Sequence, residues 1–399
     1  MHDMYVEQLK GFLRKNVSFF ALVFFSIAFL SSSILARKIL TDSDFYYFTS
    51  VLTIISIYFS LCFLGSEQLL LRHASVMSFS RIRINGNILL VMFFSLILFS
   101  LVFSVISELM FFRLQSKSLY ILIGLCVGSF VFVYNSLRLQ GFFFLAQVAA
   151  NGWKLPLLLA VASSLWGDFR FLISSSLFIS FLFTIIIFQS KKKYIDIFWS
   201  DLPEDWFNLY LGFMGSLFTI MLIGHLDRLL VVKYLSPSEF SNYVYLIMIL
   251  IMPFSLIANY FGFREVPKLK VSYNPRSFLS RIKLIGFGCI VLFSLWFIFV
   301  WAISSYLQVN IESDFFIPSV LIIVARILYS FMSALFGLTA SARDIMISNV
   351  IFIILIVAST SFLVFIGFTV LNILYFSAFI WSSRFSLYFL FSRKIKAYG

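Results

Sequence analysis

The chain is a series of apolar stretches separated by short polar connections. Each stretch holds about 20 residues, and a helix of that length, rising about 1.5 Å per residue, crosses roughly 30 Å of hydrocarbon. Backbone groups inside a bilayer must pair within their own segment, which favours helices. The pattern predicts about twelve membrane-spanning helices, at residues 17–36, 45–66, 88–107, 119–138, 141–163, 170–189, 212–232, 240–262, 284–304, 315–338, 345–366 and 368–391.

The composition indicates the same class of protein. Of the 399 residues, 61% are apolar and 12% are charged, whereas soluble domains are about 45–50% apolar and about 25% charged. A water-soluble globule is thus excluded. A single anchor on a soluble domain is excluded too, because the apolar stretches continue from residue 17 to residue 392. The predicted fold class is an all-α, polytopic integral membrane protein whose first stretch is retained as a span.

The basic residues predict the orientation of the chain. With the N-terminus in the cytoplasm, 20 of the 30 Lys and Arg fall in cytoplasmic segments, 7 fall in the opposite segments and 3 lie inside spans. The positive-inside rule then places both termini in the cytoplasm. This distribution also accounts for the net charge of +13, so we expect the partners to be membrane lipids and no nucleic acid.

Two segments of the chain predict an internal repeat. Residues 38–48 (KILTDSDFYYF) and 233–243 (KYLSPSEFSNY) share the pattern K-x-L-[TS]-x-S-[DE]-F-x-x-[FY] at an offset of 195 residues, and the same offset relates the spans of the two halves. We expect two six-helix bundles of the same orientation with a substrate site between them. Chance similarity between amphipathic loops is the alternative. The predicted domains are residues 1–195 and 212–399, joined by a cytoplasmic linker at 196–211.

A family resemblance is carried by ILARKILTDSDFYYF (34–48), GSEQLLLR (65–72), HLDRLLVVKYLSPSEFSNY (225–243) and REVPKLK (264–270). With the repeat plan, these segments resemble the polysaccharide-transporter branch of the multidrug/oligosaccharidyl-lipid/polysaccharide exporter superfamily, in particular its Wzx-type O-antigen flippases. The resemblance implies alternating-access translocation of an undecaprenyl-diphosphate-linked oligosaccharide across the bacterial inner membrane, with no cofactor. It also implies contact with a polysaccharide polymerase and a chain-length regulator.

Two cations lie near the middle of predicted spans. A charged side chain at the bilayer centre costs several kcal/mol on insertion scales, so Lys154 and Arg326 are candidates for function. Under the resemblance, we expect both to face a water-filled cavity and to bind the diphosphate of the lipid carrier through charge-assisted hydrogen bonds. The alternative is structural, with each cation pairing with backbone carbonyls or a polar neighbour and holding helices together.

The segment around Lys154 predicts a broken helix. Pro156 removes a helical hydrogen bond, and Gly152 loosens the same turn. A broken span commonly lines a cavity in transporters, and Asn151 then offers a donor for sugar hydroxyls. An ordinary proline kink is the equal alternative.

Charges at the ends of spans give further candidates. Arg37 and Lys38 stand at the outer end of the first span, as interface anchors or as part of a cationic ring at the cavity mouth. Near the outer end of the seventh span, Asp227 and Arg228 are candidates for ion coupling or for a latch, with the partner of Asp227 expected on another helix.

Glu67 and Arg72 follow the second span on its inner side, where we expect a corresponding inner contact. Arg384 lies in the cytoplasmic third of the last predicted span, and we expect its long side chain to reach the interface.

Motifs for catalysis or metal binding are missing from the sequence. It contains no H-E-x-x-H, G-x-S-x-G or Walker pattern, and its three cysteines form no C-x-x-C pair. We therefore expect no enzyme activity and no metal site. Two other functions stay open. An O-antigen polymerase or ligase would carry a large periplasmic loop, and a multidrug exporter of the same superfamily would carry acids in its N-terminal half.

Overall fold

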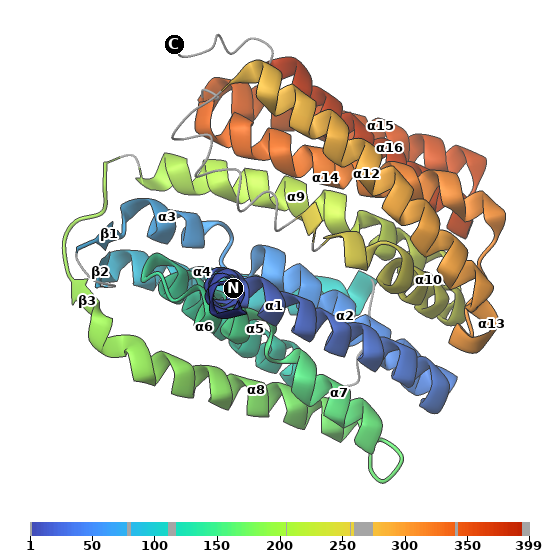
Figure 1. The fold of residues 1–399 in the computed structure, drawn as a ribbon, viewed down its shortest axis with the longest axis horizontal. Coiled ribbons are helices and arrows are strands. Elements are labelled where there is room, and N and C mark those ends of the chain that lie inside the picture. Colours follow the sequence, from blue (N-terminus) through green and yellow to red (C-terminus); the bar gives the residue numbers. More distant parts are fainter. Residues whose placement is uncertain are drawn as a thin grey trace. The chain divides into compact units, whose positions relative to one another are not determined.

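The computed structural model describes the chain except residues 1, 78–80, 111–116, 205, 256, 259–273, 340–341 and 393–399. Residues 2–16, 76, 110, 117, 337–339, 342 and 345 are described by their backbone only. In this part of the chain, 11 helices are long and apolar enough to cross a membrane. The protein is therefore an all-α polytopic membrane protein, as predicted (Figure 1).

The chain divides into two compact units, residues 1–218 and 219–399. The division falls inside one long helix, α9 (Trp206–Tyr234), close to the predicted start of the second bundle at residue 212. The predicted linker at 196–211 contains ordered structure, because a strand ends within it and α9 begins there.

Unit 1 consists of helices joined to a small sheet, coloured blue to green in Figure 1. The first six predicted spans all correspond to helices, with the fifth in two pieces. The elements before α9 are α1 (His2–Ile39), α2 (Asp42–Leu61), α3 (Ser66–His73), β1 (Ser75–Val76), β2 (Ile82–Asn85), α4 (Gly86–Met110), α5 (Lys117–Leu139), α6 (Phe143–Asn151), α7 (Lys154–Ser163), α8 (Phe169–Lys191), η1 (Lys192–Tyr194) and β3 (Ile195–Phe198).

Unit 2 continues from α9 with α10 (Pro237–Leu250), α12 (Pro275–Ala302), α13 (Ser304–Leu307), η2 (Ser313–Phe315), α14 (Phe316–Thr339), α15 (Ala342–Ile366) and α16 (Val370–Ser392). The count of eleven rather than twelve arises at the predicted eighth span, 240–262. There α10 supplies 14 residues. Part of the rest of this span lies outside the described residues, and the segment 264–270 lies wholly outside them.

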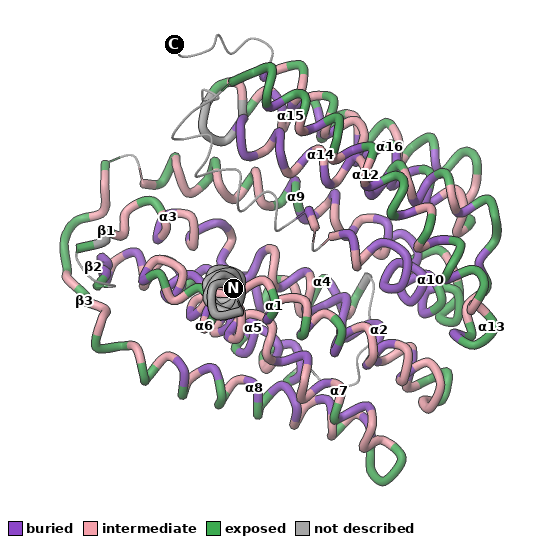
Figure 2. The backbone as a smooth tube through the Cα atoms, viewed as in Figure 1, coloured by how far each residue is buried: buried purple, intermediate pink, exposed green. Residues whose placement is uncertain are grey.

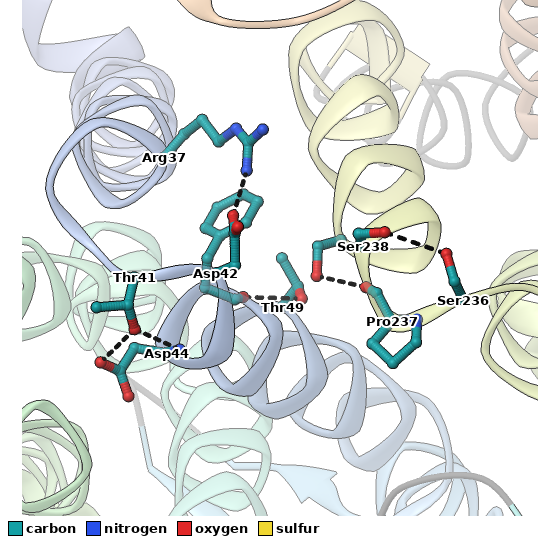
Figure 3. A network of polar contacts seen from close by, with 10 residues as sticks. Arg37, Thr41, Asp42, Asp44, Thr49, Ser236, Pro237 and Ser238 are labelled. Carbon is teal, nitrogen blue, oxygen red and sulfur yellow. Dashed lines mark hydrogen bonds and ion pairs between the residues drawn. The ribbon is translucent and has the colours of Figure 1, made fainter.

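The two segments of the predicted repeat each begin a helix with a capping side chain, and Figure 3 shows Thr41 with Asp44 at the first of them. At α2, the Thr41 hydroxyl accepts a hydrogen bond from the Asp44 backbone N–H at 3.2 Å. At α10, Ser236 and Glu239 form a capping box, in which the Glu239 carboxylate accepts from the Ser236 backbone N–H at 2.9 Å. The shared pattern [TS]-x-S-[DE] thus has a local physical role, because it satisfies backbone donors at a helix start.

The sheet of unit 1 brings two distant connections together. Its order is β1–β2–β3, with β1 and β2 antiparallel and β2 and β3 parallel, in the register Ile82↔Ile195 to Asn85↔Phe198. Four membrane crossings separate β2 from β3, namely α4, α5, the pair α6–α7 and α8. An even number of crossings returns the chain to one side of a membrane, which agrees with the predicted alternation of the spans.

Contacts at the opposite ends of the same helices agree with the predicted alternation of the spans as well. Asp44, after α1, lies 4.0 Å from Arg170, after α7, as an ion pair. An even number of crossings again separates these two residues, so both connections lie on one side. The two connections that form the sheet carry six basic residues, at Arg72, Arg81, Arg83, Lys191, Lys192 and Lys193. The assignment of their side to the cytoplasm stays a prediction from the positive-inside rule.

The helices are apolar on their outer faces as well as in the core. Along α8, buried Ile173, Leu177 and Ile187 recur at helical spacing, while Phe171 and Ile186 are more than 60% exposed (Figure 2). An outward apolar face would be unfavourable in water but is the expected surface in lipid. The exposed apolar side chains include many of the 54 phenylalanines, such as Phe93, Phe94 and Phe365.

Candidate functional site

The predicted broken helix is confirmed in unit 1. Helix α6 ends at Asn151 and α7 begins at Lys154, with a turn at Gly152 and Trp153 between them. The Gly152 backbone N–H donates to the Val148 carbonyl at 2.7 Å, and a Cβ at Gly152 would lie 2.5 Å from that oxygen. A side chain does not fit there without movement of the backbone.

Pro156 explains the rest of the break. It has no N–H to give to the Gly152 carbonyl, which accepts from the Leu155 N–H at 3.2 Å instead. The hydrogen bond at this point therefore spans three residues instead of four, and Lys154 lies on the first turn of α7.

The ammonium group of Lys154 is buried and lacks an acidic partner. The residue is 9% exposed. Its Nζ donates to Asn151 Oδ1 at 2.7 Å and lies 5.6 Å from the centre of the Phe29 ring. Among the described residues, no carboxylate lies within ion-pair distance of it. Asn151 in turn donates to the Gln147 side-chain oxygen at 3.0 Å, so the amide oxygen of Asn151 is directed at the lysine.

The neighbouring Trp153 was not predicted as a site residue. Its ring packs against Phe29 and Phe59, with centroids 5.9 and 6.2 Å apart. Its indole N–H is buried and has no hydrogen-bond partner among the described residues. The ammonium group of Lys154 has three N–H donors, of which one has a described acceptor. Lys154 and Trp153 thus hold more buried donors than the described acceptors satisfy.

A second buried charged cluster lies in unit 2. Asp227 on α9 is 7% exposed, and its Oδ2 accepts a hydrogen bond from the Tyr243 hydroxyl on α10 at 2.7 Å. The expectation that Asp227 has its partner on another helix is confirmed, although this partner is a tyrosine. The other carboxylate oxygen of Asp227 is buried without a hydrogen-bond partner in the described part of the chain.

Arg326 on α14 joins this cluster. It interacts electrostatically with both Asp227 and Arg228, and its guanidinium group lies 4.7 Å from the centre of the Trp381 ring on α16. Three residues predicted from the sequence therefore lie within electrostatic range of one another in unit 2, with Tyr243 bound to Asp227 and Trp381 beside Arg326. Among the described residues, Arg326 and Asp227 form no ion pair within 4.0 Å. Two arginines and one aspartate leave the three charged side chains with a net positive charge.

Arg384 corrects a prediction. The expected extension of this side chain to the interface is wrong, because the residue is 0% exposed. Its Nη2 donates to the Asn349 side-chain oxygen at 2.9 Å and to the Tyr388 hydroxyl at 2.6 Å, and its guanidinium group lies 5.0 Å from the Phe352 ring centre. Nη2 has two neutral acceptors and the guanidinium group lies against aromatic rings, whereas Nε and Nη1 are buried without a hydrogen-bond partner among the described residues.

The cations at the outer end of the first span lie in separate environments. Arg37 is 3.5 Å from the Asp42 carboxylate and 5.1 Å from the Phe45 ring centre, which ties α1 to the start of α2 (Figure 3). Lys38 is partly buried. The cationic ring predicted for Arg37 and Lys38 stays a prediction.

Glu67 and Arg72 lie on α3 and are not joined as an ion pair within the described residues. Arg72 is exposed, whereas Glu67 is partly buried, and burial raises the pKa of its carboxyl group above the ordinary value. Helix α3 begins after Gly65, whose φ is +92°. A Cβ at Gly65 would lie 2.8 Å from the Met214 backbone nitrogen on α9, so the break between α2 and α3 requires glycine.

No family model, curated protein or solved structure matches the chain. Among the described residues, no group of three or more His, Cys, Asp or Glu side chains is placed to hold a metal ion. The site is therefore defined by its own chemistry, which consists of membrane-embedded cations solvated by amides, hydroxyls and aromatic rings.

Proposed function

We propose that the protein is a flippase that moves an undecaprenyl-diphosphate-linked oligosaccharide, an O-antigen repeat unit, across the bacterial inner membrane. The observation that carries this proposal is the presence of a membrane-embedded cation in each unit, Lys154 and Arg326, that is not neutralised by a carboxylate of its own. Lys154 has an amide oxygen and an aromatic ring as partners. Arg326 has no carboxylate within ion-pair distance among the described residues, and Asp227 and Arg228 both act on it electrostatically.

The chemistry of a diphosphate-linked cargo fits the cations and amides of the site. A diphosphate is a strong acceptor that must lose its hydration shell to cross hydrocarbon, and charge-assisted hydrogen bonds from Lys and Arg replace that shell. The donors of Lys154 and the indole N–H of Trp153 are available for such bonds. Amide groups such as that of Asn151 suit sugar hydroxyls, because an amide both donates and accepts.

The charge balance favours an anionic cargo over the cationic cargo of a multidrug exporter. Asp227 is the one buried carboxylate among the described residues. Its Oδ2 already accepts from Tyr243, and the carboxylate acts electrostatically on Arg326. We propose that Asp227 and Arg228 couple or gate the movement of the two units, which alternate the access of the cargo by rocking.

A transport assay tests the function. Purified full-length protein is reconstituted into vesicles that contain a fluorescent undecaprenyl-diphosphate oligosaccharide in both leaflets, and a membrane-impermeant glycosidase is added outside. In protein-free vesicles, the enzyme cleaves only the outer pool. With the protein present, we expect the inner pool to become cleavable as well.

The same assay separates the alternatives. Cleavage confined to the outer pool, in vesicles whose protein is folded, would contradict transport. Lengthening of the oligosaccharide by the protein would identify a polymerase instead. Movement of a lipophilic cation but not of the diphosphate lipid would identify a multidrug exporter.

A further inference from the structure

The small sheet of unit 1 lies at the ends of two membrane spans. Strand β2 ends at Asn85 and α4 begins at the next residue, while α8 ends at Lys191, four residues before β3 begins. Helix α4 has 25 residues, a length of about 37 Å, which exceeds the roughly 30 Å of hydrocarbon by a few ångströms at each end. The sheet therefore lies at the level of the lipid headgroups.

The sheet has one apolar face, which is buried on β2 and exposed at the end of β3. Because β2 and β3 pair in register, Ile82, Ile84, Ile195 and Ile197 point to the same face. Ile82 and Ile84 are almost fully buried, whereas Ile197 is 51% exposed. The exposed end of the apolar face lies on β3, next to the start of a span.

Trp199 extends this exposed apolar end and is held in a fixed position. It is 65% exposed, yet its ring packs on Gly86, where a Cβ would lie 2.7 Å from ring carbons. The next residue, Ser200, is held by two hydrogen bonds, since the side-chain amides of Asn85 and Asn87 donate to its carbonyl at 3.0 and 2.9 Å. An exposed tryptophan fixed at the first residue of a span is typical of the membrane interface.

Basic side chains lie at the other end of the same strands, where β2 and β3 begin. Lys192 and Lys193 follow α8 directly and are exposed, and Arg81 is exposed at the start of β2. Asp196, the acid on β3, is paired with Arg83 at 3.5 Å. In the described part of the chain, no carboxylate lies within ion-pair distance of the two lysines. The positive charge at the headgroup level is therefore available to external anions.

We infer that the β3 edge of the sheet, with Lys192 and Lys193 before the strand and Ile197 and Trp199 at its far end, is a binding site for the headgroups of anionic phospholipids in the adjoining leaflet. Lysines together with apolar and aromatic side chains along one exposed edge at the membrane surface are the combination that recognises an anionic lipid surface. The site concerns the surrounding bilayer rather than the cargo, so it does not depend on the proposed transport function.

The test measures which lipid contacts Trp199. The full-length protein is placed in nanodiscs that contain an equal mole fraction of either brominated phosphatidylglycerol or brominated phosphatidylcholine, and quenching of tryptophan fluorescence is recorded. The Trp199 signal is obtained as the difference from Trp199→Phe, because the chain has 7 tryptophans. We expect stronger quenching by the anionic lipid, with a local excess of about fivefold for each lysine.

Variants separate charge from fold. The double variant Lys192→Gln and Lys193→Gln is expected to lose the preference for phosphatidylglycerol, whereas Lys192→Arg with Lys193→Arg retains it. The matched control is Arg276→Gln with Lys283→Gln, two exposed cations on α12 that leave the sheet intact. Equal quenching by both lipids in the unmodified protein would overturn the proposed selectivity. Absence of quenching would show that Trp199 faces water or a protein partner, and would overturn the site itself.

Discussion

The break between α2 and α3 predicts how strongly a substitution at Gly65 lowers the free energy of unfolding. At Gly65, φ is +92°, and a Cβ would lie 2.8 Å from the Met214 nitrogen and 2.9 Å from the Phe213 carbonyl carbon. Both atoms belong to the backbone of α9, so neither can be relieved by a side-chain rotation. Gly141 has a similar φ of +80° but nothing within 4 Å of its Cβ position. The two glycines therefore share the conformational strain and differ in the steric clash.

The substitution Gly65→Ala combines both costs. Placing alanine at positive φ costs about 1–2 kcal/mol, and inserting a methyl group into packed structure costs about 1–3 kcal/mol. We expect a loss of about 2–5 kcal/mol for Gly65→Ala and about 1–2 kcal/mol for Gly141→Ala. At about 2–4 °C per kcal/mol for a unit of this size, Gly65→Ala is expected to lower Tm about twice as much as Gly141→Ala.

The assay is thermal unfolding of the purified full-length protein in detergent, with both variants at the same scan rate, since unfolding of such proteins is often irreversible. Equal shifts in Tm would contradict the predicted clash at Gly65, because they would show that α9 does not approach the α2–α3 break closely. A smaller shift for Gly65→Ala than for Gly141→Ala would refute it as well.

Three further outcomes follow from local contacts. Burial raises the pKa of Glu67, so its contribution to stability is full below the ordinary value of 4.5 and is lost as pH rises through the raised pKa; Glu67→Gln should remove this decline in Tm. Hydrogen bonds from Ser236 lower the pKa of Glu239; Ser236→Ala should cost about 1 kcal/mol at pH 7, and chemical unfolding should show that cost shrinking as pH falls below 4.5 through the lowered pKa. Gly152→Ala, with its Cβ 2.5 Å from the Val148 oxygen, should destabilise the protein by about 1–3 kcal/mol, whereas Gly224→Ala, with open space at its Cβ, should not lower Tm.

The pattern of apolar residues predicts the fold well, because the length of a span is fixed by the bilayer. Helix α8, Phe169–Lys191, differs from its predicted range of 170–189 by two residues or fewer at each end. The break before Lys154 was also predictable, because Gly152 and Pro156 act on their own turn.

The junction near 366–369, where Gly367 is the one turn signal, is a tight connection, because α15 ends at Ile366 and α16 begins at Val370. The predicted span 240–262 stays a prediction, since α10, with its 14 residues, ends at Leu250 and part of the rest of the span lies outside the described residues.

The side-chain partners were harder to predict, because they depend on which helices pack together. The buried position of Arg384 requires Asn349 on α15 and Tyr388 on its own helix, and no local pattern signals that combination. Tyr243 was missed for the same reason, although its hydroxyl is the partner of Asp227. Aromatic and amide side chains in apolar stretches are abundant here, so their roles become visible only when the cations are placed.

The sheet shows a different limit of sequence patterns. Strands β2 and β3 have four residues each and lie 109 residues apart from the end of one to the start of the other. Short polar-apolar alternation in a connection carries little signal beside spans of more than 20 residues. Their pairing follows from the ends of α4 and α8, which bring the two connections together.

The membrane-embedded cations are the central feature of the proposed flippase, and transport by charge variants examines their role. Lys154→Gln and Arg326→Gln keep hydrogen-bonding groups but remove the charge, and Lys154→Arg and Arg326→Lys keep the charge. A hydrogen bond to a charged group is worth about 1.5–3 kcal/mol, so each Gln variant should slow translocation of the diphosphate-linked oligosaccharide by about tenfold or more, while the charge-retaining variants keep most of the rate. Translocation at the unmodified rate by both Gln variants, in protein that is folded and equally reconstituted, would contradict the account.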